Sequence, residues 1–171
     1  GTAFPLSPHL WYHMPAMDAR MRTLAARTKA VWEQTADPLL ALGCLLLALV
    51  LYLQTLAPSV AALYDDSLEF PLVAHRLAIA HPTGYPLYTL LARLASLGPW
   101  SNVAWSVNLL SALAAAATVA LVYLVGRCLS PGRRLPALAS ALALAVSPVF
   151  WSQAVVAEVY ALHAAFVAGL L

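Results

Sequence analysis

A run without a single charged side chain, residues 38–57, constrains this chain more than any other feature. Such a run is long enough, as an α-helix, to cross the roughly 30 Å hydrocarbon core of a bilayer. The whole chain has the same character, because hydrophobic residues make up 63% of it and charged residues only 9%. A soluble domain of 171 residues has too little interior to bury this much apolar surface. The sequence therefore predicts an integral membrane protein with several helices.

Composition also excludes two other classes of protein. A disordered chain is poor in hydrophobic residues and rich in charge, which is the opposite of what is found here. A nucleic-acid-binding protein carries a strongly basic face, whereas the net charge of this chain is only +2. We therefore expect the lipid bilayer, and no nucleic acid, among its partners.

The distribution of basic residues predicts how the chain is threaded through the membrane. Basic side chains are concentrated before the first apolar run, at Arg20, Arg22, Arg27 and Lys29. Positive residues stay on the cytoplasmic side, so we expect residues 1–37 to be a cytoplasmic segment and residues 38–171 to be the membrane domain. The apolar runs predict spans at residues 38–57, 103–129, 135–149 and 154–171. The chain begins with Gly1 and stops inside an apolar run at Leu171, so we expect it to be part of a longer multi-pass protein.

The segment between the first two spans, residues 58–102, is predicted to be an outer loop with interfacial helices. A short amphipathic helix is expected over residues 72–80, and residues 87–97 are too short to cross the bilayer. Treating residues 87–97 as interfacial also keeps the arginines after the second span in the cytoplasm.

Three acidic residues near the start of this loop are the first candidates for chemistry: Asp65, Asp66 and Glu69. One interpretation is a capping box, with Asp66 as the N-cap and Glu69 three positions later. Pro71 favours another interpretation, because proline suits the first position of a helix and would leave the acids in a preceding loop. A carboxylate positioned there can act as a general base toward a hydroxyl group.

Further candidates lie downstream of the acidic residues. Arg76, His81 and Arg93 can hold an anionic phosphate, although arginines near a bilayer also simply reach for the headgroups. Glu158 is the only acid in a long apolar run, and a carboxylate there is costly enough to indicate a functional site or an interfacial position. If the predicted topology holds, Glu158 faces the same side of the membrane as Asp66.

Several stretches of this sequence resemble a known family: DSLE (66–69), AIAHPTGYPLYTLLARL (78–94), NLLSAL (108–113) and FWSQAVVAEVYALHAAF (150–166). The family is a large bacterial membrane family related to the eukaryotic transmembrane protein O-mannosyltransferases. The resemblance covers roughly residues 56–171. It implies an all-α polytopic membrane protein, the N-terminal portion of a helical bundle of the C-type glycosyltransferase (GT-C) fold.

By this resemblance, Asp66 and Glu69 correspond to the catalytic acids of the family. The resemblance and the residue types together assign substrate binding to seven residues: Asp65, Arg76, His81, Tyr85, Arg93, Glu158 and Tyr160. Leu68 departs from the family pattern, which usually has glycine at this position, and glycine permits backbone conformations that leucine does not.

The resemblance implies a membrane glycosyltransferase that moves a sugar such as mannose from a polyprenyl-phosphate donor to a hydroxyl acceptor on a protein or glycan. The expected location is the bacterial cytoplasmic membrane, with the active loop outside. No metal site is assigned, and a divalent metal is neither required nor excluded by the sequence. The alternatives are a transporter or flippase fragment and a non-catalytic membrane subunit. We expect this segment to be inactive alone.

Overall fold

A computed structural model describes residues 19–61, 65–100 and 102–171, with side chains from residue 35 onward. The chain divides into two units, Gly1–Asp37 and Pro38–Leu171. In the first unit, the described residues form the beginning of α1 (Ala19–Gln54). All other elements lie in the second unit, and they are helices throughout the described ranges: α2 (Asp65–Arg76), α3 (Pro86–Ser96), α4 (Val103–Leu129), α5 (Arg134–Ala145), α6 (Pro148–Ala154) and α7 (Tyr160–Leu170). The expected all-helical membrane architecture is therefore confirmed.

Two described helical stretches are long and apolar enough to cross a membrane, Thr35–Gln54 and Val103–Leu129. The second has the bounds expected from the sequence, and its N-cap Asn102 accepts a hydrogen bond from the Ala104 backbone N–H. Asparagine is a favoured N-cap because its side chain satisfies a backbone donor that the helix leaves unpaired. These two helices supply the minimum of a multi-pass arrangement.

Within the third and fourth expected spans, the helix bounds differ from those expected. The helix expected over residues 135–149 is α5, which ends at Ala145 and is followed by α6 after a bend of 62°. Pro148 explains the break, because proline disfavours helical backbone in the residue before it, and Ser147 is extended. The helix expected over residues 154–171 begins only at Tyr160, so residues 155–159 are non-helical. This gap separates α6 from α7.

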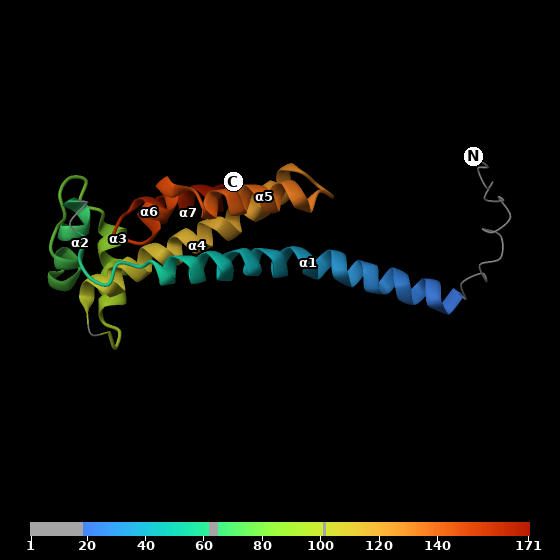
Figure 1. The fold of residues 1–171 in the computed structure, drawn as a ribbon, viewed down its shortest axis with the longest axis horizontal. Coiled ribbons are helices and arrows are strands. Elements are labelled where there is room, and N and C mark those ends of the chain that lie inside the picture. Colours follow the sequence, from blue (N-terminus) through green and yellow to red (C-terminus); the bar gives the residue numbers. More distant parts are fainter. Residues whose placement is uncertain (1–18, 62–64, 101) are drawn as a thin grey trace, which may run out of the picture. The chain divides into compact units, whose positions relative to one another are not determined.

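Helix α4 is the centre of the second unit, and it packs against α5, α7, α3, α6 and α2 (Figure 1). Its buried face is rich in alanine, which lets neighbouring helices approach closely. Gly126 marks a close approach of α4 and α5, because a Cβ atom there would lie 2.9 Å from the Cα of Ala137 on α5. The buried residues Ala41, Cys44, Ala48 and Tyr52 recur on one face of α1 and join the same core. Small residues therefore set the packing of the bundle.

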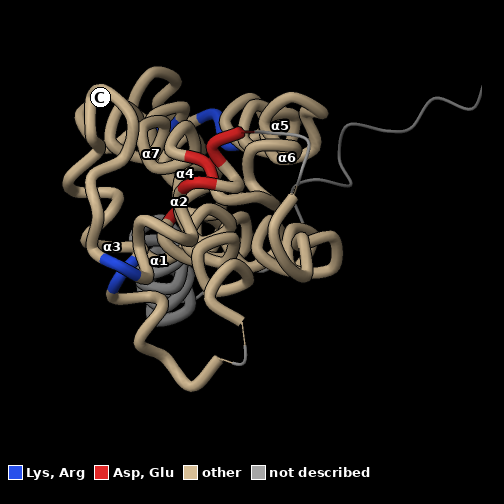
Figure 2. The backbone as a smooth tube through the Cα atoms, turned by 90° about the vertical axis from the view of Figure 1, so that its left-hand side faces the viewer, with Lys and Arg blue, Asp and Glu red and all other residues tan. Residues whose placement is uncertain are grey.

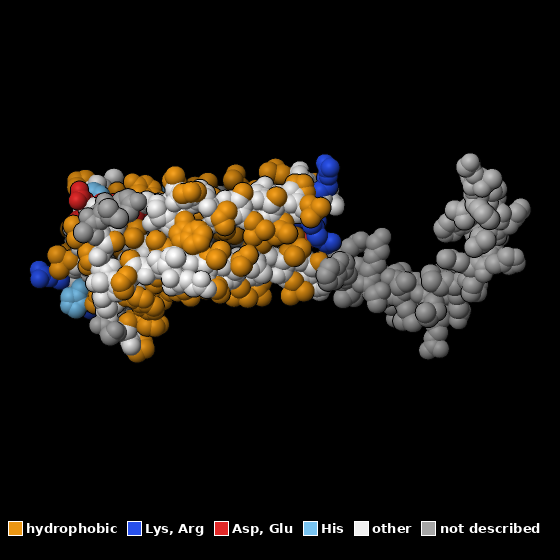
Figure 3. Space-filling model, viewed as in Figure 1, with side chains coloured by type: hydrophobic (Ala, Val, Ile, Leu, Met, Phe, Trp, Pro, Cys, Tyr) orange, Lys and Arg blue, Asp and Glu red, His pale blue; other side chains and the backbone are white. Residues whose placement is uncertain are grey.

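The surface of the second unit agrees with a membrane environment. Large hydrophobic side chains such as Leu39, Leu42 and Leu46 are exposed along α1. Figure 3 shows hydrophobic side chains covering the middle of this unit, with Lys and Arg toward its two ends. Such an outward apolar band is what a bilayer would cover.

Helices α2 and α3 form a second, smaller core at one end of α4. Phe70, Val73 and Ala74 of α2 are buried there with Tyr88 and Ala92 of α3. Both helices are too short to cross a bilayer, as the sequence indicated. This end of the second unit carries the candidate site.

Candidate functional site

Helix α2 begins at Asp65, which corrects the expectation of a loop carrying the acids ahead of a helix that starts at Pro71. Pro71 lies inside the helix, where proline removes a backbone hydrogen bond at a cost of about 3 kcal/mol. Burial of Pro71 together with Phe70 offsets that cost. Leu68 is helical, so it requires none of the freedom of a glycine. Asp66 and Glu69 are three residues apart and consequently lie on the same face of α2.

A turn after α2 brings His81 back onto these acids. Leu77 ends the helix with a φ of 50°, and the chain reverses through Gly84 and Tyr85, with φ of 87° and 42°, before α3 begins. The backbone N–H of His81 donates to Glu69 Oε1 at 2.8 Å, and His81 Nδ1 lies 2.6 Å from Glu69 Oε2. Both carboxylate oxygens of Glu69 are therefore engaged by one residue. Asp66 is not the N-cap that a capping box requires, because α2 already begins at Asp65.

The other ring nitrogen of His81 faces Asp66. The distance from Nε2 to Asp66 Oδ1 is 3.9 Å, too long for a hydrogen bond but close enough for electrostatic attraction. The side chains of Asp66, Glu69 and His81 are about one third exposed. This group, which we call the Asp66–Glu69–His81 cluster, is therefore open to solvent.

The contact between Glu69 and His81 changes the acid–base behaviour of both residues. The hydrogen bond from His81 lowers the pKa of the Glu69 carboxyl group, because it favours the ionised form. The same bond, with the negative charges of Glu69, Asp66 and Glu158, raises the pKa of His81 against a smaller opposing effect of burial. Glu69 is consequently a weak proton acceptor, and His81 carries positive charge over a wider pH range than an ordinary histidine.

Glu158 lies in the non-helical segment between α6 and α7, and only 2% of it is exposed. The Ser111 hydroxyl of α4 accepts from the Glu158 backbone N–H and donates to its carbonyl, each at 3.2 Å. The neighbouring Ala157 carbonyl accepts a hydrogen bond from Ser67 Oγ of α2 at 3.3 Å. These bonds hold the segment against both helices.

The Glu158 carboxylate interacts electrostatically with both Asp66 and His81. Burial is the main cause that raises its pKa to about 7, the charge of Asp66 adds to it, and His81 opposes it. Its Oε2 atom has no hydrogen-bond partner among the described residues. The structure thus brings Glu158 beside Asp66, although the two residues are far apart in the sequence.

An aromatic group lines the other side of His81. The Tyr85 ring lies 5.2 Å from the His81 ring and 5.6 Å from the Phe70 ring, both edge-on. Tyr88 packs on Phe70 at 4.8 Å, and burial raises the pKa of its hydroxyl group. These rings fix the orientation of His81, because aromatic edge-to-face contacts favour one geometry.

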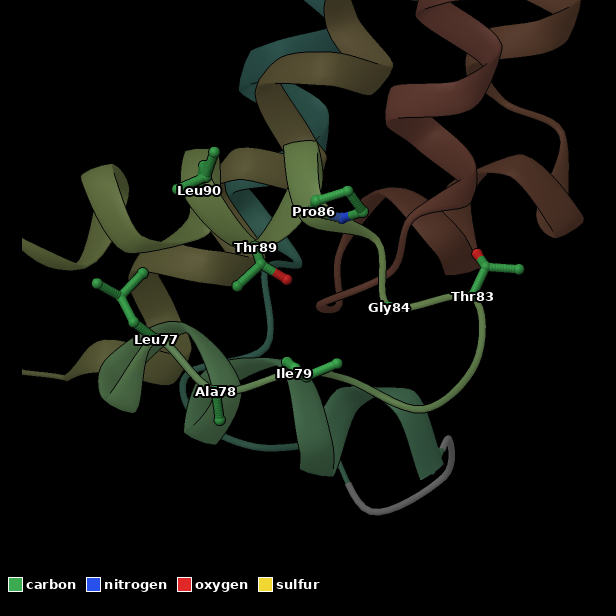
Figure 4. A pocket seen from close by; sticks show the side chains of 8 residues that line it. All are labelled: Leu77, Ala78, Ile79, Thr83, Gly84, Pro86, Thr89 and Leu90. Carbon is green, nitrogen blue, oxygen red and sulfur yellow. The ribbon is translucent and has the colours of Figure 1, made fainter.

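A pocket of about 420 Å³ lies between the end of α2 and the start of α3, close to this turn (Figure 4). Its lining is mostly apolar: Leu77, Ala78, Ile79, Thr83, Gly84, Pro86, Thr89 and Leu90. Thr89 is 7% exposed, and its hydroxyl oxygen has no partner within the described chain. The pocket offers an apolar chamber with one unused hydrogen-bonding group.

The remaining sequence candidates are not gathered at the cluster by any contact of the described residues. Asp65 and Arg76 are exposed at the two ends of α2, and Tyr160 is exposed at the start of α7. Arg93 donates from Nη1 to the His75 carbonyl at 2.7 Å, so it caps the C-terminal end of α2. Figure 2 shows the acidic segments that are visible in this view in one group beside α2.

Sequence reasoning did not identify the two serines that hold the site together. Ser67 was read only as part of the acidic motif, and Ser111 only as part of an apolar span. A small hydroxyl residue inside a membrane helix is a weak signal, because it often bonds its own helix backbone. Here Ser67 and Ser111 instead bond a segment 90 and 47 residues away.

The cluster contains one group of side chains that could hold a metal ion. One ligand atom each from Asp66, Glu69 and His81 can be chosen so that all lie within 4.8 Å of one another. The sequence analysis assigned no metal site to these residues.

Comparison with known proteins gives a consistent result. The sequence profile of the family described as "Protein O-mannosyl-transferase TMEM260 N-terminal domain" matches residues 66–171. The chain is 41% identical over 107 residues to the mouse protein O-mannosyl-transferase TMEM260. The matched region covers 62% of this chain and 15% of the mouse protein. It is 33% identical over 125 residues to the counterpart in Dictyostelium discoideum, which covers 71% of this chain. The chain spans about 15% of the length of each relative. No solved structure matches it.

Proposed function

Since the chain belongs to the family of protein O-mannosyl-transferase TMEM260 N-terminal domains, we propose that it forms the N-terminal part of a membrane glycosyltransferase of the GT-C fold. The enzyme transfers a sugar, mannose by the names of its relatives, from a polyprenyl-phosphate donor to a hydroxyl group of a protein. The observation that carries this proposal is the partly exposed Asp66–Glu69–His81 cluster with Glu158 beside it at one end of an apolar bundle.

Asp66 is the proposed general base. Glu69 is bound by His81 through both oxygens, and the lowered pKa makes it a poor proton acceptor. Glu158 is 2% exposed and lies behind the cluster. Asp66 is the carboxylate of the three that is both partly exposed and not hydrogen-bonded to His81. It is therefore the one that an acceptor hydroxyl can approach.

The proposed reaction is a direct displacement. Asp66 takes the proton of the acceptor hydroxyl while its oxygen forms a bond to the anomeric carbon of the donor sugar. The bond from that carbon to the phosphate oxygen breaks, and its electron pair leaves with the lipid phosphate. The leaving phosphate is proposed to be stabilised by Arg76, His81 and Arg93. Further contacts to the sugar donor or to the acceptor protein are proposed for Asp65, Tyr85, Glu158 and Tyr160. The apolar pocket beside Thr89 is a candidate site for the start of the prenyl chain.

Two features support placing the cluster on the outer side of the membrane. Arg127 ends α4 and Arg134 begins α5, so the turn between these helices is basic and is expected on the cytoplasmic side. Helices α2 and α3 adjoin the opposite, N-terminal end of α4. The N-terminus is then cytoplasmic, and residues 1–37 and 38–171 are proposed as the cytoplasmic and membrane parts.

The test is sugar transfer by the full-length protein that contains this segment. Membranes with wild type or Asp66→Asn at matched levels receive a labelled polyprenyl-phosphate mannose and an acceptor protein. We expect the variant to lose about 10²- to 10⁴-fold in rate, the usual contribution of a general base. His75→Gln, which changes an exposed side chain on the same helix, serves as the control for expression and insertion. Transfer by Asp66→Asn at the wild-type rate would exclude Asp66 as the base.

A further inference from the structure

We infer that Asp66 and His81 form a binding site for a divalent transition-metal ion, with Glu69 as the residue that orients the histidine. The observations behind this inference are the geometry of the Asp66–Glu69–His81 cluster and the buried Oε2 atom of Glu158 next to it, which has no hydrogen-bond partner among the described residues. The site involves the same residues as the proposed function. Metal binding is measured without a sugar donor, so the two proposals can fail separately.

The spacing of the two ligand atoms suits an ion. Zinc and similar ions bind histidine nitrogen and carboxylate oxygen at about 2.0–2.2 Å. An ion at that distance from both atoms fits between His81 Nε2 and Asp66 Oδ1, which are 3.9 Å apart. No movement of either side chain is required. Oδ1 of Asp66 is sufficient for this bond, so its second oxygen stays available to accept a proton.

The contact between Glu69 and His81 prepares the histidine for this role. When Nδ1–H donates to Glu69 Oε2 at 2.6 Å, the lone pair of the neutral ring is left on Nε2, which faces Asp66. A histidine that binds a metal commonly donates its other ring N–H to a carboxylate, which fixes the tautomer and the ring orientation. Tyr85 and Phe70 pack on the ring and hold it in place.

Glu158 is the independent observation that points to a cation. Only 2% of Glu158 is exposed, and its Oε2 atom has no hydrogen-bond partner in the described residues. Its carboxyl group interacts electrostatically with both Asp66 and His81. A buried carboxylate without a partner is expensive, and a nearby cation would remove that cost.

The ligand types indicate which ion is bound. Imidazole is a poor ligand for Mg²⁺ and Ca²⁺, which prefer oxygen, whereas Mn²⁺ and Zn²⁺ accept carboxylate and imidazole together. Two protein ligands leave several coordination positions for water or an anionic group. We therefore expect an exchangeable ion such as Mn²⁺ that supplies positive charge to a bound phosphate.

The experiment is a titration of the purified full-length protein with Mn²⁺, followed through the electron paramagnetic resonance signal of free Mn²⁺. The protein is first stripped with a chelator, and its thermal unfolding without metal is recorded for each variant to confirm folding. We expect wild type to bind one ion more than His81→Gln or Asp66→Asn. Glu69→Gln should retain the site but weaken it by about 10- to 100-fold, as loss of an orienting carboxylate does.

The matched control is His75→Gln, which removes another imidazole from the same region but outside the cluster, and it should bind Mn²⁺ as wild type does. Identical titrations of wild type, Asp66→Asn and His81→Gln would overturn the metal site. Sugar transfer that persists unchanged in a chelator would then leave the glycosyltransferase intact. Mn²⁺ binding without any sugar transfer would support the metal site and contradict the proposed glycosyltransferase.

Discussion

The two cores of residues 38–171 are built on different principles. The core around α4 and α5 consists mainly of alanine, with contacts so close that Gly126 cannot accept even a methyl group without movement. The core around α2 and α3 also contains alanine, but the Phe70 and Tyr88 rings pack at its centre, and it is edged by charged residues and by serines that bond across long distances in the sequence. Shape determines the first core, whereas a few directional contacts and charges determine the second. The two should therefore respond to different perturbations.

The largest effect on stability is expected from the charge of Glu158. Its pKa is raised to about 7, above the ordinary value of 4.5, so the folded state binds the proton more tightly than the unfolded state. The contribution of this proton to the free energy of unfolding is then fully present below about pH 4.5. It is lost as the pH rises toward 7, by up to about 3 kcal/mol. Thermal unfolding of metal-free protein between pH 5 and 8 should show this loss.

The Glu158→Gln variant keeps the size of the side chain and cannot ionise. Its unfolding temperature should therefore change little between pH 5 and 8, whereas that of the wild type should fall. An equal pH dependence in both proteins would place the titrating group elsewhere. The described residues of the alanine core include no carboxyl group and no histidine, so this experiment addresses the second core specifically.

The complementary test enlarges one residue in the alanine core. Gly126→Ala places a Cβ atom 2.9 Å from Ala137 Cα, and we expect it to lower the free energy of unfolding by about 1–3 kcal/mol. Gly43→Ala on α1 meets nothing within 4 Å, and alanine favours a helix over glycine by about 1 kcal/mol. Opposite signs for the two variants in a denaturation assay would support packing by shape, and equal effects would contradict it.

The smallest predicted effect concerns one hydrogen bond in the alanine core. The Tyr52 hydroxyl of α1 is fully buried and donates to the Ala145 carbonyl at the end of α5 at 3.0 Å. Tyr52→Phe removes the donor and keeps the ring, so we expect a loss of about 0.5–1.5 kcal/mol in unfolding free energy. A loss above that of Gly126→Ala would mean that this core also depends on directional contacts.

Parts of this structure follow directly from local sequence, and other parts do not. Val103–Leu129 is helical over the residues expected because a long apolar run preceded by an asparagine cap has few alternatives. The predicted start of α2 at Pro71 was wrong because the preference of proline for the first position of a helix describes an isolated helix. Burial of Phe70 and Pro71 against the rest of the unit outweighs that preference. Local rules fail where tertiary packing is strong.

The candidate site shows the same division. The sequence indicated Asp66, Glu69, His81 and Glu158 individually, because acids and histidines beside apolar runs are uncommon. It did not indicate which carboxylate His81 would engage, since that depends on the reversal at Gly84 and Tyr85. It also did not indicate that Arg93, which stays a predicted phosphate contact, would donate from Nη1 to the His75 carbonyl at the end of α2. Partners of this kind are decided by the three-dimensional path of the chain.

The bond between Ser67 and Ala157 has a consequence for the order in which this protein can be made. The two residues are 90 positions apart, so a ribosome must synthesise the whole of α4, α5 and α6 before α2 meets its final neighbour. A growing chain that has released only α2 and α3 into the membrane exposes Asp66 and His81 without Glu158. The charged end of the bundle is thus incomplete until Glu158 has been made, and any earlier insertion intermediate has Asp66 and His81 without their buried neighbour.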